Sequence, residues 1–222
     1  MTSSGRRGPG GARDAVLERA ARLFAEKGYD AASMRELAEE VAVRPSSLYH
    51  HFPGKDRILF EICFGFQRDF LQVVLPELLA ERAPPEAIRA AIRGHILFSN
   101  RRWAQVVVGM RERRSLPADQ QAAINALRRQ YRDALAATIE RGCRQGVFSV
   151  PDPKLAAMAV LDMVNGIAHW FRPRDRRDLE RLAAGYGDAA VALVRGWGRA
   201  PPPDQPNDRS VGWPLDSAPS GC

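Results

Sequence analysis

Residues 23–58, LFAEKGYDAASMRELAEEVAVRPSSLYHHFPGKDRI, decide the fold at the N-terminal end of this chain. A first helix is expected over 13–27, and Gly28 follows it as the left-handed residue that ends many helices. Ser33 and Glu36 stand at the capping-box spacing, at which the hydroxyl and the carboxylate each bind the other residue's free backbone amide. They predict that a second, short helix begins here.

A third short helix is expected from Pro45 to about Phe52. Proline suits the first helical position because the N–H that it lacks would stay unpaired there, and Pro53-Gly54 ends the helix. At about 100° per residue, Leu48 and Phe52 point together into a core. The opposite face carries small or polar side chains: Ser46, Ser47 and His50. Two helices separated by only a few residues predict a helix-turn-helix arrangement.

The adjacent histidines His50 and His51 do not suit a metal site. Neighbouring side chains on a helix diverge by about 100°, whereas two histidines that share a metal on one helix are spaced i,i+4. We expect His50 on the outward face, and His51 on the other flank, packed near Leu48 and Phe52 or capping the helix. The chain also lacks HExxH, ExxH sets and Gly-rich phosphate loops, so an all-α enzyme has little support. We predict no catalytic residue, no metal ligand and no cofactor.

Helical periodicity continues through the rest of the chain, so the predicted fold class is all-α with about nine helices. A long fourth helix over 55–80 has apolar residues on two faces, which two different bodies must cover. Five further helices are expected over 85–100, 102–111, 117–145, 152–172 and 176–199. The predicted domains are a flexible tail over 1–11, a helix-turn-helix domain over 12–57, a larger helical domain over 58–199 and a disordered Pro-rich tail over 200–222.

Composition excludes several classes of protein. No apolar run approaches the roughly 18 residues of a membrane span, and no apolar segment follows the N-terminal arginines, so we expect a cytoplasmic protein with no membrane partner. The three cysteines fit neither a disulfide framework nor a metal site, so Cys63, Cys143 and Cys222 are expected to be free thiols, the first two buried. The net charge of +7 permits a nucleic acid partner, but residues 1–55 carry nine Lys/Arg against seven Asp/Glu, so most of the excess lies elsewhere.

The segment over 23–58 closely resembles the DNA-binding segment of the TetR family of transcriptional regulators, from the capped second helix to the LYHHF end of the third. The resemblance implies a double-stranded DNA operator as partner. It also implies DNA contacts from the residues at matching positions: Ser33, Arg44, Pro45, Ser46, Ser47, Tyr49, His50 and Lys55. Arg44 is the best candidate for a guanine contact, because a guanidinium pairs bidentately with that base, while Ser33, Tyr49 and Lys55 match phosphate contacts.

Two positions depart from the usual pattern of the family. Ala42 stands where glycine is usual in the turn, and we therefore expect a turn that does not need a positive φ. Ser46 stands where glycine or alanine is common, which we expect to alter the base preference.

The larger domain is predicted to bind a ligand and to dimerise. Its last two helices, with LAAMAVLDMVNGIAHWF and LERLAAGYGDAAVALVRGW, combine small residues with apolar stripes on more than one side, which favours a four-helix homodimer interface over a plain core role. Aromatic and flexible residues of the middle helices, beside polar residues of the eighth, predict an apolar cavity. Its expected lining is Phe60, Phe64, Phe98, Trp103, Val107, Met110, Tyr131, Asn165 and His169, although His169 fits a buried structural histidine equally well.

The stretches QVVVGMRERRSL, ERGCRQGVF and NGIAHWFRP resemble the TetR branch that controls fatty-acid, phenylacetate or sterol-side-chain breakdown and leaves DNA on binding an acyl-CoA thioester. The resemblance implies an acyl-CoA effector, whose phosphates we expect to meet basic residues of the larger domain: Arg101, Arg102, Arg111, Arg113 and Arg114. We thus expect a homodimeric, ligand-responsive repressor on a pseudo-palindromic operator. A repressor that responds to drugs or other metabolites and an architectural DNA-binding protein without an effector stay open as alternatives.

Overall fold

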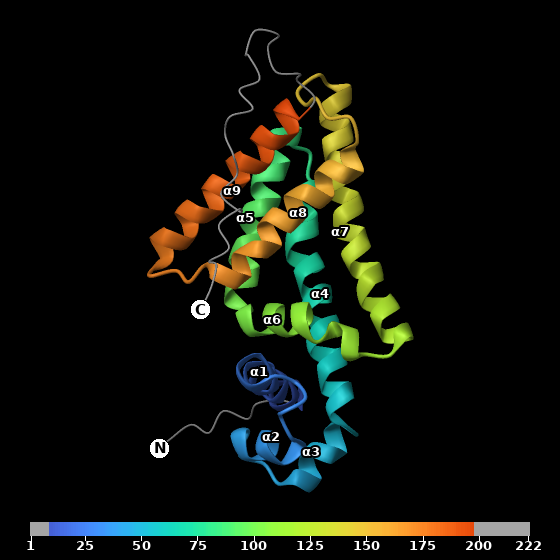
Figure 1. Ribbon diagram of the computed structural model, residues 1–222, viewed down its shortest axis with the longest axis vertical. Coiled ribbons are helices and arrows are strands. Elements are labelled where there is room, and N and C mark those ends of the chain that lie inside the picture. Colours follow the sequence, from blue (N-terminus) through green and yellow to red (C-terminus); the bar gives the residue numbers. More distant parts are fainter. Residues whose placement is uncertain (1–8, 198–222) are drawn as a thin grey trace, which may run out of the picture.

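The computed structural model describes residues 9–197, and the nine helices expected from the sequence are all present in that range (Figure 1). They are α1 (Pro9–Lys27), α2 (Met34–Glu40), α3 (Pro45–His51), α4 (Lys55–Leu79), α5 (Pro84–Arg101), α6 (Trp103–Arg111), α7 (Ala118–Arg144), α8 (Pro153–Trp170) and α9 (Arg176–Gly196). A short 3-10 turn, η1 (Arg113–Ser115), was not expected. The first helix begins inside the predicted N-terminal tail, and the rest of both predicted tails lies outside the described residues. Among the described helices, none combines the length and apolarity that crossing a bilayer requires.

The helices α1, α2 and α3 form a small core at the lower end of the molecule (Figure 1). Phe24, Leu37, Leu48 and Phe52 are all at most 1% exposed, and each fully buried side chain of this kind stabilises the fold by roughly 1.5–3 kcal/mol. The predicted capping box is confirmed, because Ser33 Oγ accepts a hydrogen bond from the Glu36 N–H (3.1 Å) and Glu36 Oε2 accepts one from the Ser33 N–H (3.0 Å).

Helix α4 connects this small core to the larger bundle above it (Figure 1). The N-terminal core and the bundle each cover a different part of its length. Ile58 and Ile62, near its start, are buried in the N-terminal core, whereas Phe70 and Val74 are buried in the bundle. Helix α4 therefore contributes buried side chains to both cores.

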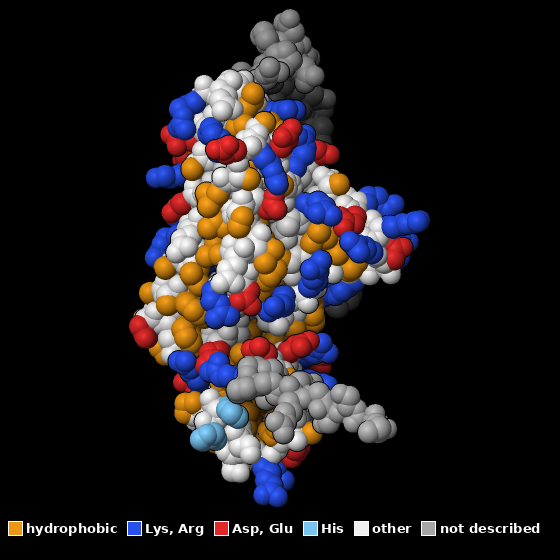
Figure 2. All heavy atoms as spheres, turned by 180° about the vertical axis from the view of Figure 1, so that it is seen from behind, with side chains coloured by type: hydrophobic (Ala, Val, Ile, Leu, Met, Phe, Trp, Pro, Cys, Tyr) orange, Lys and Arg blue, Asp and Glu red, His pale blue; other side chains and the backbone are white. Residues whose placement is uncertain are grey.

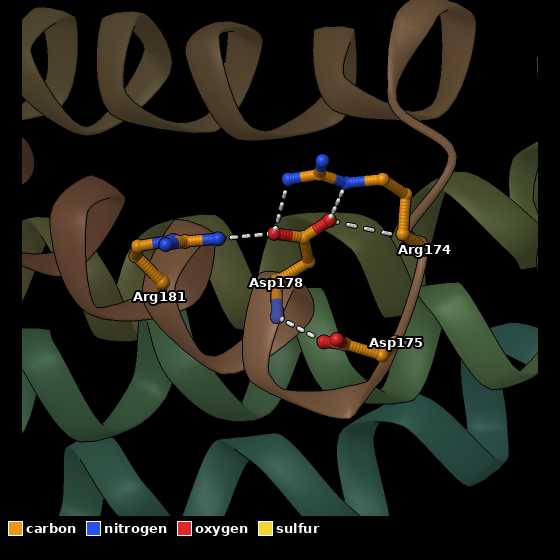
Figure 3. Close-up of polar contacts among 4 residues, drawn as sticks. All are labelled: Arg174, Asp175, Asp178 and Arg181. Carbon is orange, nitrogen blue, oxygen red and sulfur yellow. Dashed lines mark hydrogen bonds and ion pairs between the residues drawn. The ribbon is translucent and has the colours of Figure 1, made fainter.

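The bundle consists of the upper part of α4 with α5, α7, α8 and α9. Helix α9 packs along α5 at close range, since a Cβ at Gly187 would lie 3.4 Å from the Arg89 Cα atom. The start of α9 is fixed by polar contacts (Figure 3): Asp175 Oδ1 accepts a hydrogen bond from the Asp178 N–H (2.8 Å), and the Asp178 carboxylate accepts hydrogen bonds from Arg174 (2.7 Å) and Arg181. Arg174 is the main cause of the lowered pKa of Asp178, about 2.

Candidate nucleic-acid interface and ligand cavity

Helix α3 presents a polar face to solvent at the lower end of the molecule (Figure 1). Pro45 occupies the first turn, as predicted, and Leu48 points into the core. The residues predicted to contact DNA from this helix and its N-cap are all exposed: Arg44, Pro45, Ser46, Ser47, Tyr49 and His50. The exposed face of a short helix that projects from the end of a molecule has the shape that a major groove admits.

The expected packing of His51 is wrong. Its side chain is exposed, and its ring lies 5.6 Å from the ring of His50 at an interplanar angle of 66°. In Figure 2 the histidine side chains on the visible surface lie together at the lower end of the molecule, where α3 is. Leu48 and Phe52 fill the core side of the helix without help from His51, so both imidazoles belong to the polar face.

The turn between α2 and α3 corrects a second expectation, because Ala42 does adopt a positive φ of 54°. The N–H of Val43 donates to the Ala38 carbonyl oxygen (3.0 Å), and the N–H of Ala42 donates to that of Glu39 (3.1 Å). This pair of bonds is the Schellman motif, whose geometry requires a left-handed residue after the helix. The tight turn therefore imposes on an alanine the conformation that glycine adopts at no steric cost.

Lys55, at the start of α4, binds the connector between α1 and α2. Its Nζ atom donates to the carbonyl oxygens of Tyr29 (2.6 Å), Ala32 (2.9 Å) and Asp30 (3.3 Å), and it lies 4.3 Å from the centre of the Tyr29 ring. An ammonium group has three N–H donors, so these carbonyls can take all of them. Lys55 ties α4 to the helix-turn-helix, and its direct contact with a DNA phosphate stays a prediction.

A cavity of about 560 Å³ lies between α4, α5, α6, α7 and α8, in the size range of small-molecule sites. One wall is apolar and aromatic, with Phe66 and Phe70 from α4 and Tyr131 from α7. Cys63, also on this wall, is a free thiol whose pKa burial raises to about 12. A thiol with so high a pKa stays protonated, so this residue acts as a small apolar group.

Four arginines line the same cavity: Arg113, Arg128, Arg129 and Arg132. Arg113 donates to Asn125 Oδ1 (3.1 Å) and Arg132 pairs with Asp133 (2.7 Å). Arg128 is exposed as a residue, but partial loss of water around its guanidinium, followed by the neighbouring charge of Arg113, lowers its pKa, and Asp162 opposes this shift. Guanidinium groups gathered beside an apolar wall favour an anionic group on a ligand whose remaining part is apolar.

His95 and Tyr131 are buried polar residues on the cavity wall. Among the described residues, the Nδ1 atom of His95 and the hydroxyl of Tyr131 have no hydrogen-bond partner. Burial, with a smaller effect of Arg128, lowers the pKa of His95 to about 3, and burial raises the pKa of Tyr131. Both side chains are therefore neutral across the physiological pH range.

Comparison with known proteins decides the family. Residues 16–62 match the family described as bacterial regulatory proteins of the tetR family, and residues 81–194 match the tetracyclin repressor-like C-terminal domain. The chain belongs to the TetR family. Its relatives include the HTH-type transcriptional repressor KstR2 of Rhodococcus jostii, which is 29% identical over 184 residues, 81% of this chain and 89% of that protein.

Two crystal structures, one of them of a TetR-family transcriptional regulator, are similar along most of the chain. PfmR of Thermus thermophilus is 34% identical, with a TM-score of 0.74, over 80% of this chain and 97% of that one. AibR in complex with isovaleryl coenzyme A and operator DNA is 31% identical, with a TM-score of 0.73, over 83% of this chain and 98% of that one. The relatives are transcriptional regulators by name, and the enzyme alternative is set aside on that ground.

The cavity contains part of the residue set expected from the sequence. Met110, Tyr131 and Asn165 line it, and Trp103 lines a smaller adjoining cavity. The other expected lining residues lie elsewhere: Phe98 packs against Phe66 and Phe70, Phe60, Phe64 and Val107 pack in or against the N-terminal core, and His169 is exposed near the end of α8. These five side chains do not line the cavity, because they pack against other residues or face solvent.

The expected phosphate-binding arginines are also redistributed. Arg101 and Arg111 are exposed, and Arg102 pairs with Asp69 (3.5 Å) and covers the Phe98 ring. Among the arginines expected to meet phosphates, Arg113 does line the cavity, and α7 supplies the other arginines there. Sequence reasoning missed His95 and the α7 arginines, although Ile124, Arg128 and Tyr131 stand at the i, i+4, i+7 spacing of one helical face.

Proposed function

We propose that this protein is a homodimeric, ligand-responsive repressor whose effector is an acyl-CoA thioester. The observation that carries the proposal is a cavity that joins an aromatic, apolar wall to four arginines. An acyl-CoA has both matching parts, an apolar acyl group and a phosphate-bearing end. The crystal structure of AibR in complex with isovaleryl coenzyme A and operator DNA supports the same effector class for this chain.

The DNA contacts follow from the exposed face of α3. We infer that Arg44 reads a guanine in the major groove, that Ser46, Ser47 and His50 face base edges, and that Tyr49 reaches a phosphate. Ser33, exposed at the start of α2, is proposed as a second phosphate contact. A protein that works on DNA in a bacterium acts in the cytoplasm, which agrees with the expected location.

A second copy is expected to cover the outer faces of α8 and α9. Leu155 and Trp170 of α8 are large apolar residues about half exposed, and α9 exposes a stripe of small residues at helical spacing. Small residues allow helices to approach closely, and a two-fold pair of α8 and α9 forms a four-helix interface. Two copies of α3 about 34 Å apart then reach successive major grooves of a pseudo-palindrome.

The coupling between cavity and DNA runs through α4 and α6. One side of α6, with Val106 and Met110, lines the cavity, and the other, with Val107 and Val108, is buried in the core that also holds α1. Phe66 and Phe70 place α4 in the same cavity wall. A ligand that fits the cavity in only one arrangement of α4 and α6 shifts the protein to that arrangement and changes the separation of the two α3 helices.

The test uses the full-length dimer on a fluorescent duplex selected from a random pool by binding. Isovaleryl-, octanoyl-, phenylacetyl- and sterol-derived CoA thioesters are titrated into the complex, with coenzyme A and the free acids as controls. We expect at least one thioester to release the DNA where its two halves do not. Arg128→Ala should raise the concentration for half release about tenfold, whereas Arg101→Ala, at an exposed position outside the cavity, should not. Release by free apolar compounds alone would move the assignment to a drug or metabolite effector.

A further inference from the structure

Four polar side chains, which we call the collar, lie on the cavity wall: Tyr131, His95, Ser99 and Asn165. Four residues, His95, Ser99, Asn165 and the apolar Val106, line both the large cavity and a second one of about 30 Å³, so they stand where the two meet. Tyr131 adds its hydroxyl on the side of the large cavity. Beyond the collar, the small cavity is lined mainly by apolar residues, among them Trp103.

Two members of this collar have an unmet hydrogen-bonding capacity. The Tyr131 hydroxyl and the His95 Nδ1 atom are buried and find no partner within residues 9–197, and the two rings lie 5.7 Å apart. The Phe70 ring packs edge-on against both of them, at 4.7 Å from His95 and 4.9 Å from Tyr131. Polar atoms buried in this way are rare in folded proteins, because each has lost its water without a replacement.

The charge of the collar limits the ligand group that fits it. Tyr131 is a neutral donor, and His95 is a neutral ring that donates or accepts according to its tautomer. A carbonyl or hydroxyl oxygen can use these groups, whereas a plain methylene chain would leave them without partners. The four arginines, by contrast, lie where the charged end of the ligand is proposed.

We propose that the collar of Tyr131, His95, Ser99 and Asn165 binds an oxygen atom carried on the acyl group of the effector. The effector is then an oxygenated acyl-CoA, with a ketone or hydroxyl on the acyl part, rather than an unsubstituted fatty acyl-CoA. This inference rests on the proposed function and narrows its ligand class.

The experiment compares thioesters of one chain length that differ only in the acyl oxygen. Binding of octanoyl-CoA to the full-length protein is measured by calorimetry beside 3-, 5- and 7-oxooctanoyl-CoA and the matching hydroxy compounds, which separates ketone from hydroxyl. We expect at least one oxygenated thioester to bind about tenfold more tightly than octanoyl-CoA, as sites built around a hydrogen bond reject analogues that lack it. Tyr131→Phe should abolish this preference, because the affinity for the preferred oxygenated thioester falls by about tenfold.

Tyr186→Phe is the matched control, because Tyr186 is a half-buried tyrosine outside the cavity lining and its replacement should leave the preference intact. If octanoyl-CoA binds and releases DNA but no oxygenated compound binds more tightly, the collar proposal is wrong and the acyl-CoA proposal stands. An equal loss of both affinities in Tyr131→Phe would also overturn it, because that result indicates a packing role. If no thioester binds at all, the acyl-CoA proposal fails and the collar proposal fails with it.

Discussion

Replacing Lys55 by alanine tests whether this lysine holds the helix-turn-helix together or binds DNA directly. The change removes three N–H donors that reach the carbonyl oxygens of Tyr29, Asp30 and Ala32, and a cation above the Tyr29 ring. The connector between α1 and α2 then loses its attachment to α4. We expect the main effect of the substitution to be a loss of stability of the helix-turn-helix rather than the loss of a DNA contact.

The loss of stability follows from these contacts. The two short bonds, at 2.6 and 2.9 Å, go to part-buried carbonyls, and each contributes about 1 kcal/mol after a discount for water that can enter. The cation above the Tyr29 ring adds about 0.5 kcal/mol. The bond at 3.3 Å is exposed and adds little. Lys55→Ala should therefore lower the free energy of unfolding by about 2–3 kcal/mol.

Two measurements separate the roles. Urea unfolding gives the stability. Arg35→Ala is the control, because that exposed arginine forms a surface pair with Glu39 and its loss should change the stability by less than about 0.5 kcal/mol. The salt dependence of DNA binding gives the number of phosphate contacts. If Lys55 acts only as a clamp that ties α4 to the connector between α1 and α2, the slope of log affinity against log salt stays unchanged. If it binds a phosphate, its loss lowers the magnitude of that slope by about 0.9. Wild-type stability together with a lowered slope would refute the clamp and restore Lys55 as a phosphate ligand.

Three further substitutions test the turn, the base contact and the capping box. Ala42→Gly should raise the free energy of unfolding in urea by about 0.5–1 kcal/mol, because the left-handed conformation strains an alanine, and a loss of stability would contradict the positive φ of 54°. Arg44→Ala should relax base choice at one operator position at a cost of about 1–3 kcal/mol, measured on single-base variants of the selected duplex, and an equal loss on random DNA would speak against base reading. The hydrogen bond from Lys27, together with bonds from Ser33, lowers the pKa of Glu36 to about 2, so its stabilising effect is present above its ordinary pKa of 4.5 and is lost as the pH falls toward 2. Glu36→Gln should thus be less stable than wild type at pH 7 and equally stable near pH 2, whereas a difference that does not change with pH would exclude this titration.

The helix-turn-helix could be predicted because its signals are local. The capping box at Ser33, the first-turn position of Pro45 and the left-handed Gly28, with a φ of 89°, each depend on residues a few positions apart. The exception is Ala42, where the turn geometry outweighs the preference of the residue. A single sequence cannot show such strain, because alanine there could as well belong to a wider turn.

The cavity and part of its lining could be predicted, but the polar residues His95 and the α7 arginines could not. Asn165 and His169 stand i,i+4 on α8, yet His169 lies near the helix end and is exposed. His95 sits in α5, where Phe70 and Tyr131 from two other helices enclose it. Which polar residue becomes buried depends on how helices cross, and that information is spread over the whole bundle. In the sequence, the arginines of α7 look like an ordinary exposed helix face, because nothing local shows that a cavity lies beside them.

Reciprocal coupling between the two ligands tests the ligand-responsive repressor most directly. The affinity of the full-length dimer for its selected duplex is measured with and without a saturating acyl-CoA that releases DNA, and the affinity for that acyl-CoA is measured with and without saturating duplex. Both affinities should fall by the same factor, because one coupling free energy connects the two sites. Undiminished DNA affinity when the cavity is filled would contradict a repressor controlled by this cavity.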